Sequence, residues 1–151
     1  MPTKRVLAIA SGGGHWIELM QLKPALEGHE VVWCTVDRAY QAHVAGAPFY
    51  VVSDATRWDR LRLLRSLFEV ACVVWKVRPD VVLSTGALPG WFGIVFGKIM
   101  GAKTIWLDSL ANAERLSMAG AWARPFADLW LTQSPSVARP SGPHYFGTVI
   151  G

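Results

Sequence analysis

The amino-acid sequence predicts an α/β fold with a single doubly wound parallel β-sheet, in which helices cover both faces of the sheet. Short apolar runs alternate with segments of helical periodicity along the 151 residues, the pattern of repeated strand–helix–strand units. The first and fourth of these runs end in glycine-containing turns, as strands do beside the ligand-binding edge of such sheets. This length corresponds to one domain, residues 1–151, that is large enough to bury a core.

Six apolar segments have the length and composition of buried strands. The clearest is residues 6–10, a continuous apolar run typical of a strand covered on both faces. A proline- and serine-rich loop at residues 134–143 leads to a seventh short apolar segment at the end of the chain. The other expected strands are residues 30–36, 49–52, 80–84, 103–108 and 127–132.

The intervening segments have apolar residues at helical spacing. Residues 16–26 form the first expected helix, which Gly28 closes, and a short helix precedes the third strand. The longest helix is expected at residues 61–77, where Pro79 stops it. A turn at residues 85–90 then precedes a very apolar helix at 91–100, and a further helix is expected to begin near Leu110.

Composition limits the classes of partner. Hydrophobic residues make up 52% of the chain and charged residues 17%, with eight tryptophans, so some apolar surface is expected to face a partner or a bilayer. The net charge of +4 suits an anionic partner, but no nucleic-acid-binding pattern is present. No apolar stretch reaches the length of a membrane span, so any membrane contact is expected to be peripheral. Cys34 and Cys72 lie in apolar runs and are expected to be buried reduced thiols.

Two segments are candidates for contact with an anionic membrane surface. The helix within residues 57–78 carries Arg60, Arg62 and Arg65 near its beginning and many apolar residues, as do basic amphipathic helices that lie on lipid. The alternative is an ordinary core helix with solvated arginines. The second candidate is the segment with Trp91 and Phe92, which glycines flank.

The loop after the first strand is a candidate phosphate site. Ser11, Gly12, Gly13 and Gly14 lead directly into a helix, and glycines let an anion approach the free N–H groups at a helix N-terminus. No lysine of a Walker loop follows, and Ile17 stands where a dinucleotide-binding loop has its third small residue. A plain tight turn and a nucleotide site with Asp37 on a ribose are the alternatives.

The loops after the first, fourth and fifth expected strands should meet at one edge of the sheet. They carry His15, the pair Thr85 and Gly86, and Asp108, respectively. His15 is a candidate general base, or it positions a phosphate. Asp108 is the rival base, or it caps the helix expected near Leu110.

Four segments, in this order, resemble one protein family: the glycine loop, residues 79–86, residues 107–120 and residues 126–133. The family consists of acceptor-binding subunits of two-part GT-B glycosyltransferases. It includes the membrane subunit of the UDP-GlcNAc transferase of the dolichol pathway and bacterial exopolysaccharide and capsule subunits of the PssD type. The likeness runs over nearly the whole chain. A more distant likeness is to the N-terminal domain of MurG.

The resemblance implies a Rossmann-like domain equivalent to the N-terminal, acceptor-side half of a GT-B enzyme. It also implies an inverting transfer from a UDP-linked sugar to a polyprenyl-diphosphate-linked saccharide in exopolysaccharide or capsule biosynthesis. Such enzymes need no metal or other cofactor, and a separate subunit supplies the donor-binding C-terminal half. The chain is therefore expected to be inactive alone and peripheral on the cytoplasmic face of the inner or plasma membrane.

The resemblance extends to site residues. It places the acceptor diphosphate against the loops of Ser11 to Gly14 and of Thr85 and Gly86, and Arg115 lies in a family motif where it pairs with phosphate or, alternatively, with a surface acid. Like the bacterial members, the chain is expected to do without the N-terminal span of eukaryotic members, and Asp108 stands where many relatives have glutamate. Two other functions stay open, a non-catalytic membrane scaffold that recruits a catalytic partner and a stand-alone nucleotide-binding protein.

Overall fold

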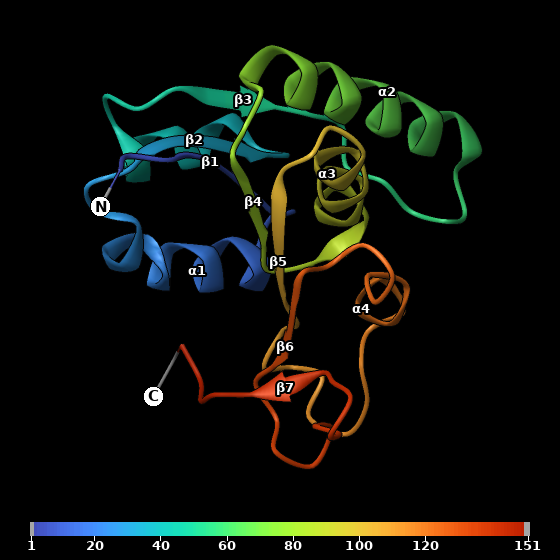
Figure 1. Cartoon of the computed structure of the whole chain (residues 1–151). Coiled ribbons are helices and arrows are strands. Elements are labelled where there is room, and N and C mark those ends of the chain that lie inside the picture. Colours follow the sequence, from blue (N-terminus) through green and yellow to red (C-terminus); the bar gives the residue numbers. More distant parts are fainter. Residues whose placement is uncertain (1, 150–151) are drawn as a thin grey trace.

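A computed structural model describes residues 2–149 and places all seven of its strands in one parallel sheet (Figure 1). The spatial order is β3-β2-β1-β4-β5-β6-β7, the order of a doubly wound sheet. The predicted fold class is thus confirmed. The strands are β1 (Arg5–Ile9), β2 (Glu30–Thr35), β3 (Phe49–Val51), β4 (Val81–Ser84), β5 (Lys103–Leu107), β6 (Leu129–Thr132) and β7 (His144–Tyr145).

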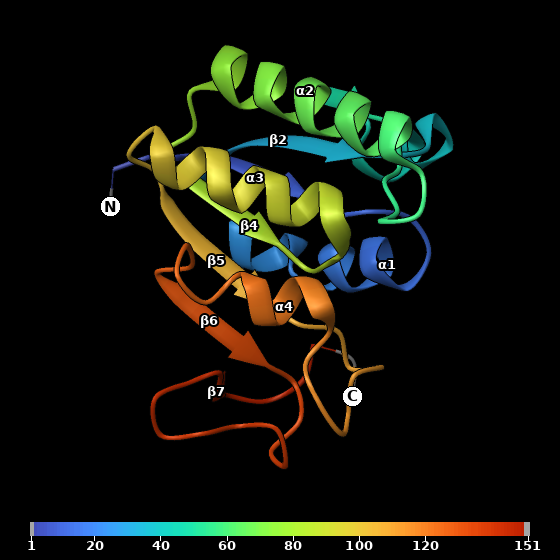
Figure 2. The same cartoon turned by 90° about the vertical axis from the view of Figure 1, so that its right-hand side faces the viewer.

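Helices cover both faces of the sheet (Figures 1 and 2). The helix α1 (Gly14–Gln21) lies on one face, and α2 (Arg60–Val77) and α3 (Ala87–Ile99) lie on the other. The short α4 (Met118–Trp122) lies beside α3. Two 3₁₀ helices, η1 (Lys23–Leu26) and η2 (Arg38–Val44), complete the connections on either side of β2.

The alternation of side chains along β1 explains its continuous apolar run. Leu7 and Ile9 belong to the core cluster under α2 and α3, whereas Val6 and Ala8 belong to the cluster under α1. Successive residues of a strand point to opposite faces, so a strand covered on both faces needs apolar residues at every position. All four side chains are at most 4% exposed.

The pairing of β1 with β4 creates the point where the strand order reverses. The chain moves outward from β1 to β2 and β3, and α2 then returns it to β4, which pairs in register with β1 from Val6↔Val81 to Ile9↔Ser84. The loops after β1 and β4 therefore emerge side by side at the carboxyl edge of the sheet. This is the place where doubly wound sheets bind ligands.

Three local expectations differ from the structure. The helix α3 begins at Ala87 rather than at residue 91, because Pro89 is compatible with the first turn of a helix, where its missing N–H costs nothing. No helix begins near Leu110, since residues 108–117 form a loop. Cys34 is buried, and burial raises the pKa of its thiol to about 12, but Cys72 is only half-buried.

Candidate functional site

The glycine loop at the end of β1 has one open side. Gly13 caps α1 with a φ of 65° and no side-chain cap, and a Cβ at Gly13 or Gly14 would meet nothing within 4 Å. Only glycine adopts this backbone angle without strain. The sequence signal for a turn that opens onto a helix N-terminus is therefore confirmed. Gly12 instead faces the ring of Tyr40, and Ser11 is buried beneath the loop.

Tyr40, in η2, contacts this loop and was missed by sequence reasoning. Its hydroxyl accepts a hydrogen bond from the N–H of Gly13 at 2.9 Å, and its ring stacks on Trp16 at 5.2 Å between centroids. Trp16 in turn donates from Nε1 to Nδ1 of His43 at 3.0 Å. Tyr40 lies 27 positions from Gly13 and no local pattern links the two, so only the fold could reveal this contact.

The ring of His15 is held in one tautomer. Its Nδ1 lies 3.2 Å from the carbonyl oxygen of Thr85, and a carbonyl can only accept, so Nδ1 carries the hydrogen. The neutral ring then has its free lone pair on Nε2. No residue in the described range, 2–149, forms a hydrogen bond with Nε2. His15 thus has a proton-accepting atom that none of the described residues occupies.

Thr85 and Gly86 hold His15 in place. The hydroxyl of Thr85 is fully buried and donates to the carbonyl oxygen of His15 at 2.6 Å. Gly86 has a φ of 144°, and a Cβ there would overlap the His15 ring. The structure therefore brings the two predicted loops together, but it turns the Thr85 side chain towards His15 rather than towards solvent.

A pocket of about 450 Å³ opens beside His15. Its lining comes from four separated segments: the start of α1, the loop between β3 and α2, the N-terminus of α3, and the region around α4. Of these lining residues only His15 was predicted as a site residue, so Arg57 and Trp58 are among those that sequence reasoning missed. The lining residues are His15, Ala55, Thr56, Arg57, Trp58, Ala87, Leu88, Asn112, Ser117, Met118 and Ala119.

Asp108 is buried and fully engaged. It is 1% exposed, and its carboxylate accepts hydrogen bonds from Nε1 of Trp106 at 3.1 Å, the hydroxyl of Ser117 at 2.6 Å and the N–H of Ser117 at 3.0 Å. The expectation that Asp108 caps a helix near Leu110 is wrong. Asp108 instead accepts the hydrogen bonds from Ser117, and Ser117 caps α4. Asp108 does not line the pocket.

A buried glutamate on α1 also escaped sequence reasoning. Glu18 is 3% exposed, and its Oε1 accepts from the N–H of Leu110 and from Nε2 of Gln133, each at 2.8 Å. Gln133 also donates to the carbonyl of Asp108 at 3.0 Å. This network ties α1 to the loops after β5 and β6. A polar side chain inside an apolar helical pattern was the available signal, because buried acids need partners.

The predicted basic residues lie on the surface. Arg115 is exposed in the loop of residues 108–117 and forms no ion pair among the described residues, so the predicted alternative of a surface acid has no support there. Arg60, Arg62 and Arg65 are exposed on α2, where Arg65 pairs with Glu69 at 3.4 Å.

The segment with Trp91 and Phe92, the second candidate for membrane contact, packs largely inside the protein rather than on its surface. Phe92 is 4% exposed and packs in the core under α3, so it offers no surface for lipid. Trp91 is half-buried, and its ring contacts those of Trp122 and Phe126 at 5.8 and 6.0 Å between centroids. The α3 helix is very apolar because it packs against β1, β4, β5, α2 and α4.

The outward face of α2 is apolar instead. Four residues at helical spacing lie on it, namely Leu61, Leu64, Phe68 and Trp75, and they are 82%, 60%, 69% and 62% exposed. The opposite side of the same helix supplies Val70, Val73, Val74 and Val77 to the core. Exposed apolar rows of this kind are a pattern that interaction surfaces often have.

Two further observations bear on membranes and metals. Across the described residues, no helix combines the length and apolar character that crossing a bilayer requires. Within residues 2–149, no group of three or more histidine, cysteine, aspartate or glutamate side chains is placed to hold a metal ion.

Comparison with known proteins identifies the fold. Neither a protein-family model nor a curated protein matches this sequence. Among solved structures, MurG of Acinetobacter baumannii matches 96% of this chain at a TM-score of 0.75 and 15% identity, with 45% of MurG covered. A UDP-N-acetylglucosamine 2-epimerase of Rickettsia bellii matches 89% of this chain at a TM-score of 0.67 and 15% identity, with 40% of its own length covered.

A glycosyltransferase of Streptomyces sp. SF2575, SsfS6, complexed with thymidine diphosphate, matches 89% of this chain at a TM-score of 0.58 and 18% identity, with 52% of its own length covered. The chain therefore has the fold of the N-terminal half of GT-B proteins such as MurG. It spans about half the length of these proteins or less.

Proposed function

We propose that this chain is the acceptor-side half of an inverting GT-B glycosyltransferase. In this proposal, a UDP-linked sugar bound by a donor-binding partner is transferred to a polyprenyl-diphosphate-linked saccharide in exopolysaccharide or capsule biosynthesis. The observation that carries the proposal is the geometry of His15. Its Nδ1–H is fixed by the Thr85 carbonyl at 3.2 Å, no described residue bonds to its Nε2, and its side chain lines the pocket at the reversal point of the sheet.

His15 acts as the general base. Nε2 accepts the proton of an acceptor hydroxyl as that oxygen attacks the anomeric carbon of the donor sugar. The bond from that carbon to the nucleoside diphosphate breaks, the diphosphate leaves with the electron pair, and attack from the opposite side inverts the configuration. The carbonyl of Thr85 stabilises the imidazolium that forms, because it accepts the hydrogen bond from Nδ1. Asp108 is a positioning residue, since its two oxygens already accept three hydrogen bonds.

The acceptor diphosphate binds between two helix N-termini. The helices α1 and α3 both begin at this edge, after Gly13 and Gly86, and neither has a side-chain cap. The first-turn N–H groups of a helix have no intrahelical acceptor and carry partial positive charge, so they favour a phosphate. The open space beside Gly13 and Gly14 supports this position.

Membrane contact is made through α2. Its exposed apolar row and its arginines together match a helix that lies on an anionic lipid surface with its apolar side inserted. In our proposal the chain is therefore peripheral on the cytoplasmic face of the membrane, where its lipid-linked acceptor is anchored. The alternative of a solvated core helix does not account for four large apolar side chains that are 60% exposed or more.

A transfer assay tests the proposal. The chain is purified alone and together with the product of the adjacent reading frame as the donor-binding partner, and each sample receives radiolabelled UDP-sugars and a prenyl-diphosphate-linked sugar. We expect labelled lipid product from the pair and none from the chain alone. Robust turnover by the chain alone would contradict the half-enzyme. Nucleotide binding by the isolated chain, without transfer by the pair, would favour the stand-alone nucleotide-binding function.

A further inference from the structure

The lining of the His15 pocket combines a cation with an exposed indole. The guanidinium of Arg57 stacks over the ring of Trp58 at 4.3 Å from its centroid, and both residues line the pocket. Trp58 is 79% exposed. These residues lie in the loop between β3 and α2, directly before Asp59, the N-cap of α2.

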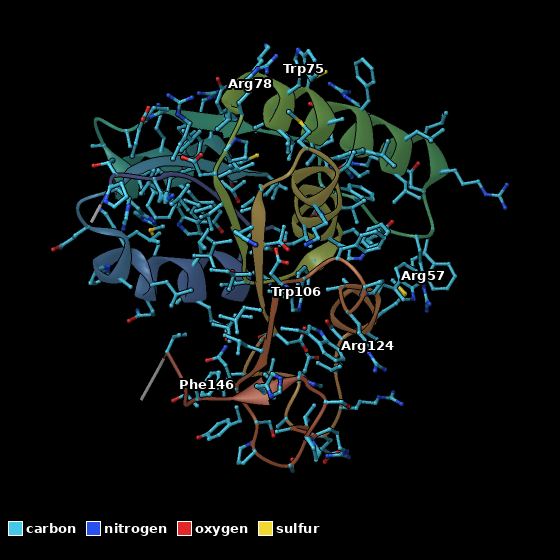
Figure 3. The ribbon with its side chains drawn as sticks, viewed as in Figure 1. Arg57, Trp75, Arg78, Trp106, Arg124 and Phe146 are labelled. Atoms are coloured by element: carbon cyan, nitrogen blue, oxygen red, sulfur yellow. The ribbon has the colours of Figure 1, made fainter. Side chains whose placement is uncertain are left out.

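Arg57 is free to bind an anion. It forms no ion pair among the described residues, and its only polar contact there apart from the Trp58 ring is between Nη1 and Sδ of Met118, at 3.5 Å. Figure 3 shows Arg57 reaching from this loop towards α4. A planar guanidinium binds phosphate oxygens through paired hydrogen bonds, so a cation without an acid partner in the lining of a pocket favours a phosphate.

Trp58 lines the pocket and precedes Leu61, the first residue of the apolar row of α2, by three positions. Leu61, in the first turn of α2, is 82% exposed, and the row continues through Leu64 to Phe68. An indole ring suits the boundary between an apolar and a wet environment. A charged group in the pocket and a hydrocarbon chain on α2 could therefore belong to one amphiphilic molecule that crosses this boundary.

We propose that Arg57 and Trp58 bind a lipid diphosphate at this pocket. The guanidinium pairs with the diphosphate, the indole packs against the first isoprene units, and the hydrocarbon continues along α2. This inference rests on the proposed function, because it gives the acceptor of that function a binding site. It assigns acceptor binding to two residues outside the glycine loop.

Binding without transfer tests this inference separately. Farnesyl diphosphate, a soluble prenyl diphosphate, and inorganic pyrophosphate are each titrated calorimetrically into the full chain in the absence of vesicles. We expect the prenyl compound to bind more tightly. Arg57→Gln should weaken both ligands about tenfold or more, whereas Trp58→Ala should weaken only farnesyl diphosphate, by roughly fivefold. Trp58→Phe, which keeps an aromatic ring, should restore most of that loss.

Arg78→Gln is the matched control. Arg78 also stacks over an exposed tryptophan of α2, Trp75, at 4.7 Å from its ring centroid, but at the other end of the helix (Figure 3). The affinity of the Arg78→Gln variant for both ligands should equal that of the wild type. Equal effects of Arg57→Gln and Arg78→Gln, equal weakening of both ligands by Trp58→Ala, or no binding of farnesyl diphosphate by the wild type would each overturn the inference. Binding as expected by a chain that gives no transfer with its partner would instead contradict only the proposed function.

Discussion

His15 illustrates how contacts from distant segments define the role of one residue. A histidine at the start of a helix can hydrogen-bond a phosphate or accept a proton, and the sequence does not distinguish the two. In the structure, the carbonyl of Thr85 fixes the hydrogen on Nδ1, and Gly86 gives the ring its space. His15 lines a pocket, and no described residue bonds to its Nε2, which favours the role of proton acceptor.

A substitution at Gly86 should disturb this arrangement. Alanine at this position adds a Cβ that would overlap the His15 ring, and the backbone angles, 144° and 177°, are ones that only glycine adopts readily. We expect Gly86→Ala to cost about 1–3 kcal/mol in the free energy of unfolding and to lower transfer by the reconstituted pair. Urea denaturation and the transfer assay measure the two effects.

Gly14→Ala provides the stability control for this prediction. A Cβ at Gly14 meets nothing within 4 Å, and alanine at the first position of α1 favours the helix. This variant should therefore unfold at the wild-type urea concentration or slightly above it. If Gly86→Ala were as stable and as active as the wild type, the contact between Gly86 and His15 would not position the ring.

The helix α2 has two faces with different roles in our proposal. Its inner side packs valines into the core, and its outer side carries an apolar row that remains uncovered within the described chain. A surface of this kind costs free energy in water unless something covers it. The nearby arginines make an anionic lipid surface the covering that our account proposes.

Removing apolar side chains from this face should weaken lipid binding. We expect Leu61→Ser combined with Phe68→Ser to reduce the affinity for vesicles containing anionic lipid at least tenfold, because each side chain contributes about 1.5–3 kcal/mol when fully buried. Replacing Arg60, Arg62 and Arg65 by glutamine should instead flatten the dependence on salt, since charge attraction is screened. Cosedimentation measures both effects.

Ile99→Ser is the matched control for the lipid-binding prediction. Ile99 is 71% exposed but ends α3, outside the apolar row, so its replacement should leave vesicle affinity unchanged. Equal losses from Ile99→Ser and from the double replacement on α2 would show that the binding is unspecific. Unchanged cosedimentation of the double variant would show that the apolar row of α2 does not contact the membrane.

For the molecule as a whole, the sequence predicted the sheet well because each signal was local. A continuous apolar run means a strand covered on both faces, and the alternation of Val6, Leu7, Ala8 and Ile9 between two core clusters is the physical origin of that pattern. The meeting of the loops after the first and fourth strands at one edge followed from the parallel strand–helix order, whereas the point where the strand order reverses became known only from the structure. The fold class, and the proximity of the glycine loop to the loop of Thr85 and Gly86, could therefore be predicted from the sequence.

Side-chain contacts between segments far apart in the sequence could not be predicted from it. The apolar composition of α3 suggested exposure to lipid, but burial against the sheet produces the same composition, and Phe92 is buried. Asp108 follows a strand as a catalytic carboxylate would, yet three donors from Trp106 and Ser117 occupy it. Tyr40 and the pocket residues Arg57 and Trp58 join the site through tertiary packing alone.

The most direct test of the central claim is the kinetics of His15→Ala in the reconstituted pair. If Nε2 of His15 accepts the acceptor proton, kcat should fall about a hundredfold or more while the KM for the lipid-linked acceptor changes little. A tenfold rise in that KM with an unchanged kcat, equivalent to about 1.4 kcal/mol, would assign His15 to binding and contradict the base. A wild-type rate together with a wild-type KM would remove His15 from the site.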